Sequence, residues 1–255
     1  MNNQLHVVLL AAGISRRLAP YWTGHPKCLL KFGDKTLLEH HLDRFRILGL
    51  SQITVVTGYE SEQITSRLAS VSDLCIQSVF NPQFREGSII SLATGLAHMP
   101  TGTDILTMDA DVLYETEVLR RIVEKPGTGF LIDETQQETG EEMMLGVRGG
   151  RVLAIARSIS NEKWDLMGET VGFFRLECRY VGILRDRIQA LIELGQRGAE
   201  YEAALQVFIQ DHAAWAVAVG GLAWTEIDFA EDVKKANDLI FPKILARDGK
   251  NRNVI

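Results

Sequence analysis

Cysteine is scarce in this sequence, which has three cysteines in 255 residues, at positions 28, 75 and 178. Their wide spacing fits neither a disulfide framework nor a zinc site, so we expect a reducing, cytoplasmic environment. No apolar run approaches the length of a membrane-spanning helix, and membrane insertion is therefore not expected. The first four residues also lack the charged and apolar regions of a signal peptide.

Basic residues are a minority, with 27 Lys and Arg against 33 Asp and Glu, and they form no block. Nucleic acid is therefore not expected as a partner, because binding to a phosphate backbone needs a basic face. The chain also lacks internal repeats and any linker rich in proline or serine. These absences favour one domain over residues 1–246, followed by a polar, frayed tail at 247–255.

The chain alternates between apolar β-like runs and segments with helical spacing. The β-like runs are 7–12, 52–57, 74–80 and 104–108, and the helical ones are 37–48, 61–68, 88–96 and 115–125. This order predicts an α/β fold with a three-layer, Rossmann-like, mixed and mostly parallel sheet, and helices on both faces. Two further runs, 142–147 and 152–156, flank a glycine turn and predict a small β-hairpin or lid subregion.

A loop that suits an anion follows the first β-like run. Gly13 ends the run, Arg16 and Arg17 follow closely, and Lys27 comes after Pro26. Glycine allows close approach of the backbone, and successive N–H groups of such a loop can bind phosphate oxygens. The pattern favours a polyphosphate ligand, and a tight turn with solvated cations is the alternative.

Two carboxylates follow the apolar run 104–108, at Asp109 and Asp111. Ligands of α/β sheets bind at the carboxyl ends of the strands, and residues i and i+2 of an extended segment point to the same side. Both carboxylates could therefore hold Mg²⁺, whose preferred ligands are hard oxygens. The alternative is a turn that caps the next helix.

Adjacent histidines at 40 and 41 point different ways on a helix, so we expect them at its surface and edge.

The anion loop resembles a known signature, L-A-A-G-x-G-x-R-[LM] followed by P-K, of the GT-A-type nucleotidyltransferase family, the sugar-1-phosphate and alcohol-phosphate nucleotidylyltransferases. The sequence matches it at 10–13, 17–18 and 26–27, and Ser15 replaces the second glycine. The likeness is nearest to the small cytidylyltransferases for phosphocholine, 2-aminoethylphosphonate or inositol-1-phosphate. Segments 105–109, 172–174 and 224–232 carry that nearer likeness.

The resemblance implies a role for each matching residue. Arg17 would hold the leaving phosphates, and Lys27 would neutralise the α-phosphate, which makes these two the catalytic candidates. Mg²⁺ would be bound by Asp109, the closest match, together with Asp228, and Asp111 lies nearby. The nucleotide-binding candidates are Leu10, Ala11, Ala12, Gly13, Ser15, Arg16, Gly58, Gly87 and Ser88.

Further residues concern the acceptor and the metal. By resemblance, Glu169 and Gly172 would lie over the acceptor. Trp164 could offer an aromatic face to a quaternary ammonium group. Glu226 shares a strand face with Asp228 and could approach the same cation, although the motif favours Asp228. Ser88 could instead be a helix N-cap, and the acidic stretch 133–142 could attract an amine or simply be solvated.

The expected activity is transfer of CMP from CTP to a phosphorylated (amino)alcohol, phosphonate or polyol, giving a CDP-alcohol and pyrophosphate. A sugar-1-phosphate nucleotidylyltransferase that uses UTP, GTP or dTTP is the alternative. A non-catalytic interaction module is a third reading, but it has no need of Arg17, Lys27, Asp109 and Asp228 together. The expected partners are the triphosphate and the phosphorylated acceptor, and a homodimer is left open.

Overall fold

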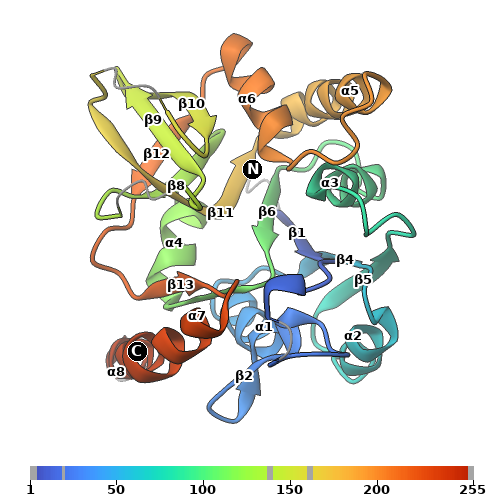
Figure 1. Ribbon diagram of the computed structural model, residues 1–255, viewed down its shortest axis with the longest axis vertical. Helices are drawn as coiled ribbons and strands as arrows, with labels where there is room; N and C mark the ends of the chain where they lie inside the picture. The colour runs from blue at the N-terminus through green and yellow to red at the C-terminus, as the bar shows by residue number, and fades with distance from the viewer. Residues whose placement is uncertain (1–4, 19–20, 137–139, 160–162, 252–255) are drawn as a thin grey trace.

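A mixed, nine-stranded sheet forms the centre of the computed structural model, which describes residues 5–18, 21–136, 140–159 and 163–251 (Figure 1). Its main path runs in the order β10-β9-β11-β6-β1-β4-β5, and β8 pairs with both β11 and β12. The strands are β1 (His6–Ala11), β4 (Gln52–Thr57), β5 (Cys75–Phe80), β6 (Ile105–Asp109), β8 (Gly129–Asp133), β9 (Met144–Arg148), β10 (Arg151–Ala156), β11 (Leu166–Leu176) and β12 (Trp215–Ala218).

Strands β6, β1, β4 and β5 pair in parallel; β6, β1 and β4 are buried on both faces, whereas the edge strand β5 is largely exposed. Val7 and Leu9 of β1 pack in the cluster that contains α1 (Leu37–Ile47), α2 (Ser61–Leu68) and α4 (Thr116–Glu124). The opposite face is covered by α3 (Ser88–Ala97), α5 (Cys178–Glu193) and α6 (Glu202–Asp211). Continuous apolar strands are required where both faces are buried. The predicted α/β class, with helices on both faces, is confirmed.

The longest strand, β11, joins the parallel half of the sheet to the rest. It pairs antiparallel with β6, β8 and β9. Its register against β8 shifts between Thr170 and Phe174, where Gly172 has a φ of +77°. The predicted hairpin exists as β9 and β10, and it extends the main sheet through β11.

The C-terminal part folds back over the first half of the chain. β7 (Val112–Tyr114) pairs with β13 (Trp224–Glu226), and β2 (Lys31–Phe32) pairs with β3 (Lys35–Thr36). After them come α7 (Ala230–Lys235), a π-helical turn (Ala236–Ile240) and α8 (Phe241–Asn251). No helix in the described ranges is both long enough and apolar enough to span a membrane.

Helix α8 continues past residue 246, where the sequence predicted that order ends. The Arg247 guanidinium donates to Glu115 Oε2 at 2.9 Å, and Asp248 Oδ1 accepts from the N–H of Thr116 at 3.0 Å. The second contact caps the N-terminus of α4, whose first N–H groups have no partner within the helix. The predicted frayed tail is therefore wrong for residues 247–251.

His41 was expected near the helix surface, and this expectation is also wrong. Its side chain is fully buried in the core beneath α1, with Nδ1 3.0 Å from the Tyr114 hydroxyl. Burial, followed by the positive charge of Arg44, lowers the pKa of His41 to about 3. The imidazole is therefore neutral over the physiological range.

Acidification should destabilise the fold through His41. Between its folded pKa of about 3 and the ordinary value of 6.5, the unfolded chain binds a proton that the folded chain does not. Stability therefore falls as the pH falls through that window. From about pH 7 to about pH 5 this residue should cost about 2 kcal/mol, and His41→Gln should remove that part of the loss.

Urea unfolding at both pH values measures this difference. His98→Gln is the matched control, because His98 lies exposed at the end of α3 and should leave the pH dependence as it is in the wild type. An unchanged pH dependence in His41→Gln would contradict the assignment.

Candidate active site

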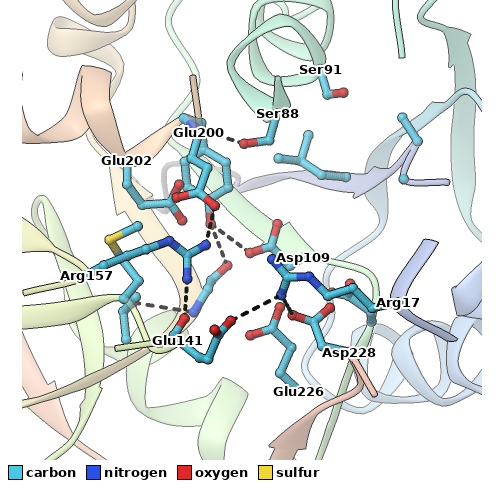
Figure 2. Close-up of a pocket in the computed structure, with 18 of the residues that line it drawn as sticks. Arg17, Ser88, Ser91, Asp109, Glu141, Arg157, Glu200, Glu202, Glu226 and Asp228 are labelled. Carbon is cyan, nitrogen blue, oxygen red and sulfur yellow. Dashed lines mark hydrogen bonds and ion pairs between the residues drawn. The ribbon is translucent and has the colours of Figure 1, made fainter. Parts of the chain in front are cut away.

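A cavity of about 330 Å³ opens where β1 and β6 end, and it is closed on its other sides by β11, the start of α3 and the start of α6. A second cavity of about 320 Å³ adjoins it and is lined by the loop that follows β1. Figure 2 shows side chains from distant parts of the sequence turned toward the first cavity. This is the edge of the sheet at which α/β proteins bind ligands.

Lys27 contacts two carboxylates from distant parts of the sequence, Asp111 and Asp228. It lies in a short 3₁₀ turn (Lys27–Leu29) after Pro26, and its Nζ is 2.5 Å from both Asp111 Oδ2 and Asp228 Oδ1. It also donates to the carbonyl of Ile227 at 3.0 Å. Burial lowers the pKa of Lys27, but the two carboxylates outweigh it, so the pKa is raised overall. The ammonium stays charged.

Asp228 is held from two further directions. The Arg17 guanidinium donates to Asp228 Oδ2 at 3.0 Å. The carboxylate of Asp232, in the first turn of α7, accepts the backbone N–H groups of Asp228 and Phe229 at 3.0 and 2.8 Å. The sequence around Asp228 thus fixes its backbone by capping α7, while its side chain meets the cations of the N-terminal loop.

The candidate metal ligands group differently from the prediction. Ligand oxygens of Asp111, Glu226 and Asp228 lie within 4.8 Å of one another, and Asp109 is not in this group. β6 ends at Asp109 and the chain turns before Asp111, so the same-side rule for extended segments does not apply to this pair. Asp109 instead accepts a hydrogen bond from the Tyr201 hydroxyl at 2.7 Å. Asp111, and not Asp109, therefore lies together with Glu226 and Asp228.

The first cavity is strongly acidic. Arg17 and Arg157 line it together with nine carboxylates: Glu86, Asp109, Asp111, Glu141, Glu169, Glu200, Glu202, Glu226 and Asp228. Burial, and then the charges of Asp111 and Glu202, raise the pKa of Asp109 well above its usual range. Burial, and then the charges of Asp111 and Asp228, do the same to the pKa of Glu226.

The pKa values of two further carboxyl groups that line the cavity are also raised. Burial, followed by the negative charges of Glu142 and Asp133, raises the pKa of Glu169 to about 7. Burial is also the main cause that raises the pKa of Glu202 to about 7. Carboxylates with pKa values raised in this way concentrate at functional sites.

The predicted nucleotide-binding residues at the end of β1 point to two different faces of the sheet. Leu10, Ala12 and Gly13 line the first cavity, whereas Ala11 packs in the core on the other side of the sheet. This alternation follows from the period of two along a strand. Ser15, Arg16 and Lys27 line the adjoining cavity.

Ser15 is strained within that loop. Its φ is +61°, and its buried Oγ has no hydrogen-bonding partner among the described residues. A residue other than glycine in this conformation costs about 1–3 kcal/mol. The hydroxyl and the neighbouring cations face a common space that an anion could fill.

Three predicted residues have mainly packing roles. A Cβ at Gly58 would lie 2.4 Å from Phe84 Cβ, and one at Gly87 would lie 2.0 Å from the carbonyl oxygen of Ala199. Neither glycine lines the first cavity. Ser88 does line it, but Gly87 is the N-cap of α3, and Ser88 Oγ accepts the N–H of Tyr201 at 2.9 Å. The alternative that Ser88 caps the helix is therefore wrong.

The acceptor candidates separate in the same way. Glu169 and Gly172 line the first cavity. Trp164 does not line it, because its indole packs against the backbone of Gly146, with the Arg148 guanidinium 5.0 Å from the ring centroid. The predicted aromatic contact with the acceptor is thus corrected.

The sequence did not predict that Arg157 and residues 200–202 line the first cavity. Arg157 pairs with Glu200 and donates to the carbonyl oxygen of Glu141, while Tyr201 holds Asp109 (Figure 2). These residues follow β10 and begin α6, and no local motif marks them. The only signal was the pair of glutamates at 200 and 202, which is common at a helix start.

Gly172→Ala should destabilise the protein by about 1–3 kcal/mol, the usual cost of a side chain at positive φ. Its Cβ would also lie 2.4 Å from Asp109 Oδ2, so the hydrogen bond from Tyr201 would have to shift. Gly182→Ala, at an open position in α5, is the control and should be neutral or stabilise by up to about 1 kcal/mol. Chemical denaturation measures both, and equal stabilities would contradict the role of Gly172.

Two curated relatives resemble most of this chain. One is the CTP:phosphoglutamine cytidylyltransferase of Campylobacter jejuni, 20% identical over 257 residues, which cover 90% of this chain and 98% of the relative. The other is the bifunctional IPC transferase and DIPP synthase of Thermococcus kodakarensis, 23% identical over 235 residues, or 91% of this chain. The chain spans about half the length of that second relative (50%).

A solved structure, the CTP:phosphocholine cytidylyltransferase of Streptococcus pneumoniae, shares the fold. The TM-score is 0.75 at 18% identity, and the match covers 92% of this chain and 99% of the other. Residues 7–170 match the family described as the MobA-like NTP transferase domain. The matched segment contains the anion loop, Lys27 and Asp111, and it is more than half of the sequence. The chain therefore belongs to the MobA-like NTP transferase domain family and is a nucleotidyltransferase.

Proposed function

We propose that this protein is a Mg²⁺-dependent cytidylyltransferase that joins CMP from CTP to a phosphorylated small molecule. The observation that carries the proposal is the contact of Lys27 with Asp111 and Asp228, beside a loop with two arginines and an unpartnered serine hydroxyl. A buried cation between two carboxylates, next to a cationic loop, suits a metal-bound triphosphate. The two relatives named for CTP use favour that nucleotide.

The residues present fit Mg²⁺. Asp111, Glu226 and Asp228 supply three hard oxygen ligands within 4.8 Å of one another, and the Lys27 ammonium contacts two of these carboxylates and offsets part of their charge. Asp111 and Asp228 would hold the ion, with Glu226 beside them. When bound, Mg²⁺ supplies positive charge to the phosphate oxygens of the nucleotide.

The side chains of the loop would organise two anions for reaction. Arg16 and Arg17 would bind the phosphates that leave, and Lys27 would neutralise negative charge at the α-phosphate. An oxygen of the acceptor phosphate attacks the α-phosphorus, the bond between the α-phosphorus and the bridging oxygen breaks, and pyrophosphate leaves with that oxygen. No side chain needs to act as a nucleophile, because the main barrier is the approach of two anions.

The acceptor class follows from the same comparison. The relatives are named for phosphoglutamine and phosphocholine, so a phosphorylated (amino)alcohol is favoured, with a CDP-alcohol or a similar diester as product. A sugar-1-phosphate acceptor with UTP, GTP or dTTP is the alternative. We place the reaction in the cytoplasm, without nucleic acid or membrane partners.

A thermal-shift series with CTP, UTP, GTP, ATP and dTTP, each with and without Mg²⁺, tests the nucleotide. A ligand that binds only the folded state raises the melting temperature. CTP with Mg²⁺ should give the largest rise. A larger rise with UTP, GTP or dTTP would favour the sugar-1-phosphate alternative, and no rise with any triphosphate would refute the proposed activity.

Asp111→Asn should raise the Mg²⁺ concentration needed for half-maximal activity by at least about tenfold, since loss of even an indirect metal contact often costs that much. Asp109→Asn is the matched comparison, because Asp109 lies two residues away and outside the metal group. It should leave the Mg²⁺ requirement unchanged, whatever it does to the rate. Titration of Mg²⁺ at saturating CTP measures both, and the opposite pattern would restore Asp109 as the ligand.

A further inference from the structure

The first cavity is lined by many more acidic than basic side chains. Nine carboxylates and two guanidiniums line it, and the acceptor itself brings a phosphate or phosphonate. Two like charges at 4 Å repel by about 4 kcal/mol in a partly buried setting. The balance therefore depends on which carboxylates are already compensated.

Most of the lining carboxylates have partners. Lys27 bridges Asp111 and Asp228, and Asp109 accepts from Tyr201. The remaining pairs are Glu86 with Arg197 at 2.6 Å, Glu141 with Arg17 at 3.8 Å, and Glu200 with Arg157. Glu226 belongs to the metal group. Among the described residues, the Glu169 carboxylate has no hydrogen-bond or ion-pair partner, and Glu202 has hydrogen bonds but no ion pair.

Glu169 lies on β11, and within the described ranges its carboxylate forms neither a hydrogen bond nor an ion pair. The charged groups that face it are Glu142, Asp133, Asp232 and Lys235, of which only the last is a cation. Its side chain thus stands among like charges, at the border of the cavity.

Glu202 is the first residue of α6, and no ion pair to it is found among the described residues. Tyr201 and its own backbone hydrogen-bond to it, Glu200 repels it, and Arg157 attracts it from a position already paired with Glu200. Figure 2 shows its carboxylate turned toward the same space as those of Asp109 and Glu226. Glu202 also borders a small pocket together with Thr170 and Gly172, next to Glu169 on β11.

We infer that the acceptor carries an ammonium group, which Glu169 and Glu202 bind while the acceptor phosphate lies toward Lys27. The substrate class is then amino-alcohol phosphates or aminophosphonates, rather than polyol phosphates. This inference rests on the proposed function, which supplies the phosphate-bearing acceptor and its site. Glu169 and Glu202 determine only the charge of the acceptor at the end away from its phosphate.

The ammonium group must carry N–H bonds. A trimethylammonium group is bound by the faces of aromatic rings. The aromatic residues that line the cavity are Phe84 and Tyr201; Phe84 packs at the Gly58 end, and the Tyr201 hydroxyl is committed to Asp109. Trp164 lies elsewhere. Carboxylates instead gain most from charge-assisted hydrogen bonds with N–H donors.

A matched pair of acceptors tests the inference. 2-Aminoethylphosphonate and 2-hydroxyethylphosphonate differ only in the ammonium and hydroxyl group. We expect kcat/KM to favour the amine by at least about tenfold, because a charged hydrogen bond replaces a neutral one. Glu169→Gln and Glu202→Gln should each reduce this ratio without changing the KM for CTP. Glu193→Gln, on the exposed surface of α5, is the control and should behave as the wild type.

Binding measured by calorimetry gives a readout that does not need turnover. The protein is loaded with Mg²⁺ and a CTP analogue that has a methylene group between the α- and β-phosphates. Because the pKa of Glu169 is raised to about 7, the ionised fraction grows from about pH 6 to about pH 8. The amine should therefore bind more tightly across that range, and the hydroxyl compound should not gain in the same way.

Several results would overturn the inference. Equal use or binding of the two phosphonates would do so, as would preference for phosphocholine or inositol-1-phosphate over phosphoethanolamine. An equal loss of both acceptors in the Glu→Gln variants would show a structural role only. If CTP raises the melting temperature but the amine is not preferred, the inference fails alone; if no triphosphate does so, the proposed function fails with it.

Discussion

The contact of one ammonium group with two carboxylates holds this site together. Lys27 comes from the loop after β1, Asp111 from the turn after β6, and Asp228 from the segment after β13, so one buried cation unites three distant parts of the chain. Its burial is unfavourable by itself, and the two carboxylates more than compensate. Because like charges would otherwise meet at this point, the position of each carboxylate depends on the cation between them. The arginines, the strained serine and the metal group are all arranged around this centre.

The parallel half of the sheet could be predicted from the sequence, because β1, β4 and β6 are buried on both faces and their runs are largely apolar. The signature also marked Arg17, Lys27 and Asp228, and the structure brings both cations into contact with Asp228. Asp109 and Asp111 could not be ranked, because a turn of the backbone between them decides which carboxylate faces the cation. Tyr201 and Arg157 reach the cavity through tertiary packing alone, and Trp164 leaves it for the same reason. Local sequence patterns do not predict where tertiary packing places such residues.

β11 decides how the two halves of the sheet meet at the cavity. Its antiparallel pairing with β6 aligns Phe173 and Phe174 against Met108 and Thr107, and the irregular register near Gly172 then sets the strand against β8. Only a residue without a side chain fits there, because Asp109 occupies the space that a Cβ would need. The same close approach lets Tyr201 reach Asp109 from α6. One glycine thus allows β6, β11 and α6 to meet at the cavity.

The contacts of Lys27 with Asp111 and Asp228 join segments that the ribosome makes at different times. When the ribosome has produced the segment up to residue 170, the cationic loop and Asp111 are present, but Tyr201 and Asp228 have not been made. A nascent chain at that stage has most of its parallel strands and only one of the two counter-charges of Lys27. Both counter-charges of Lys27 are therefore present only after synthesis has passed Asp228.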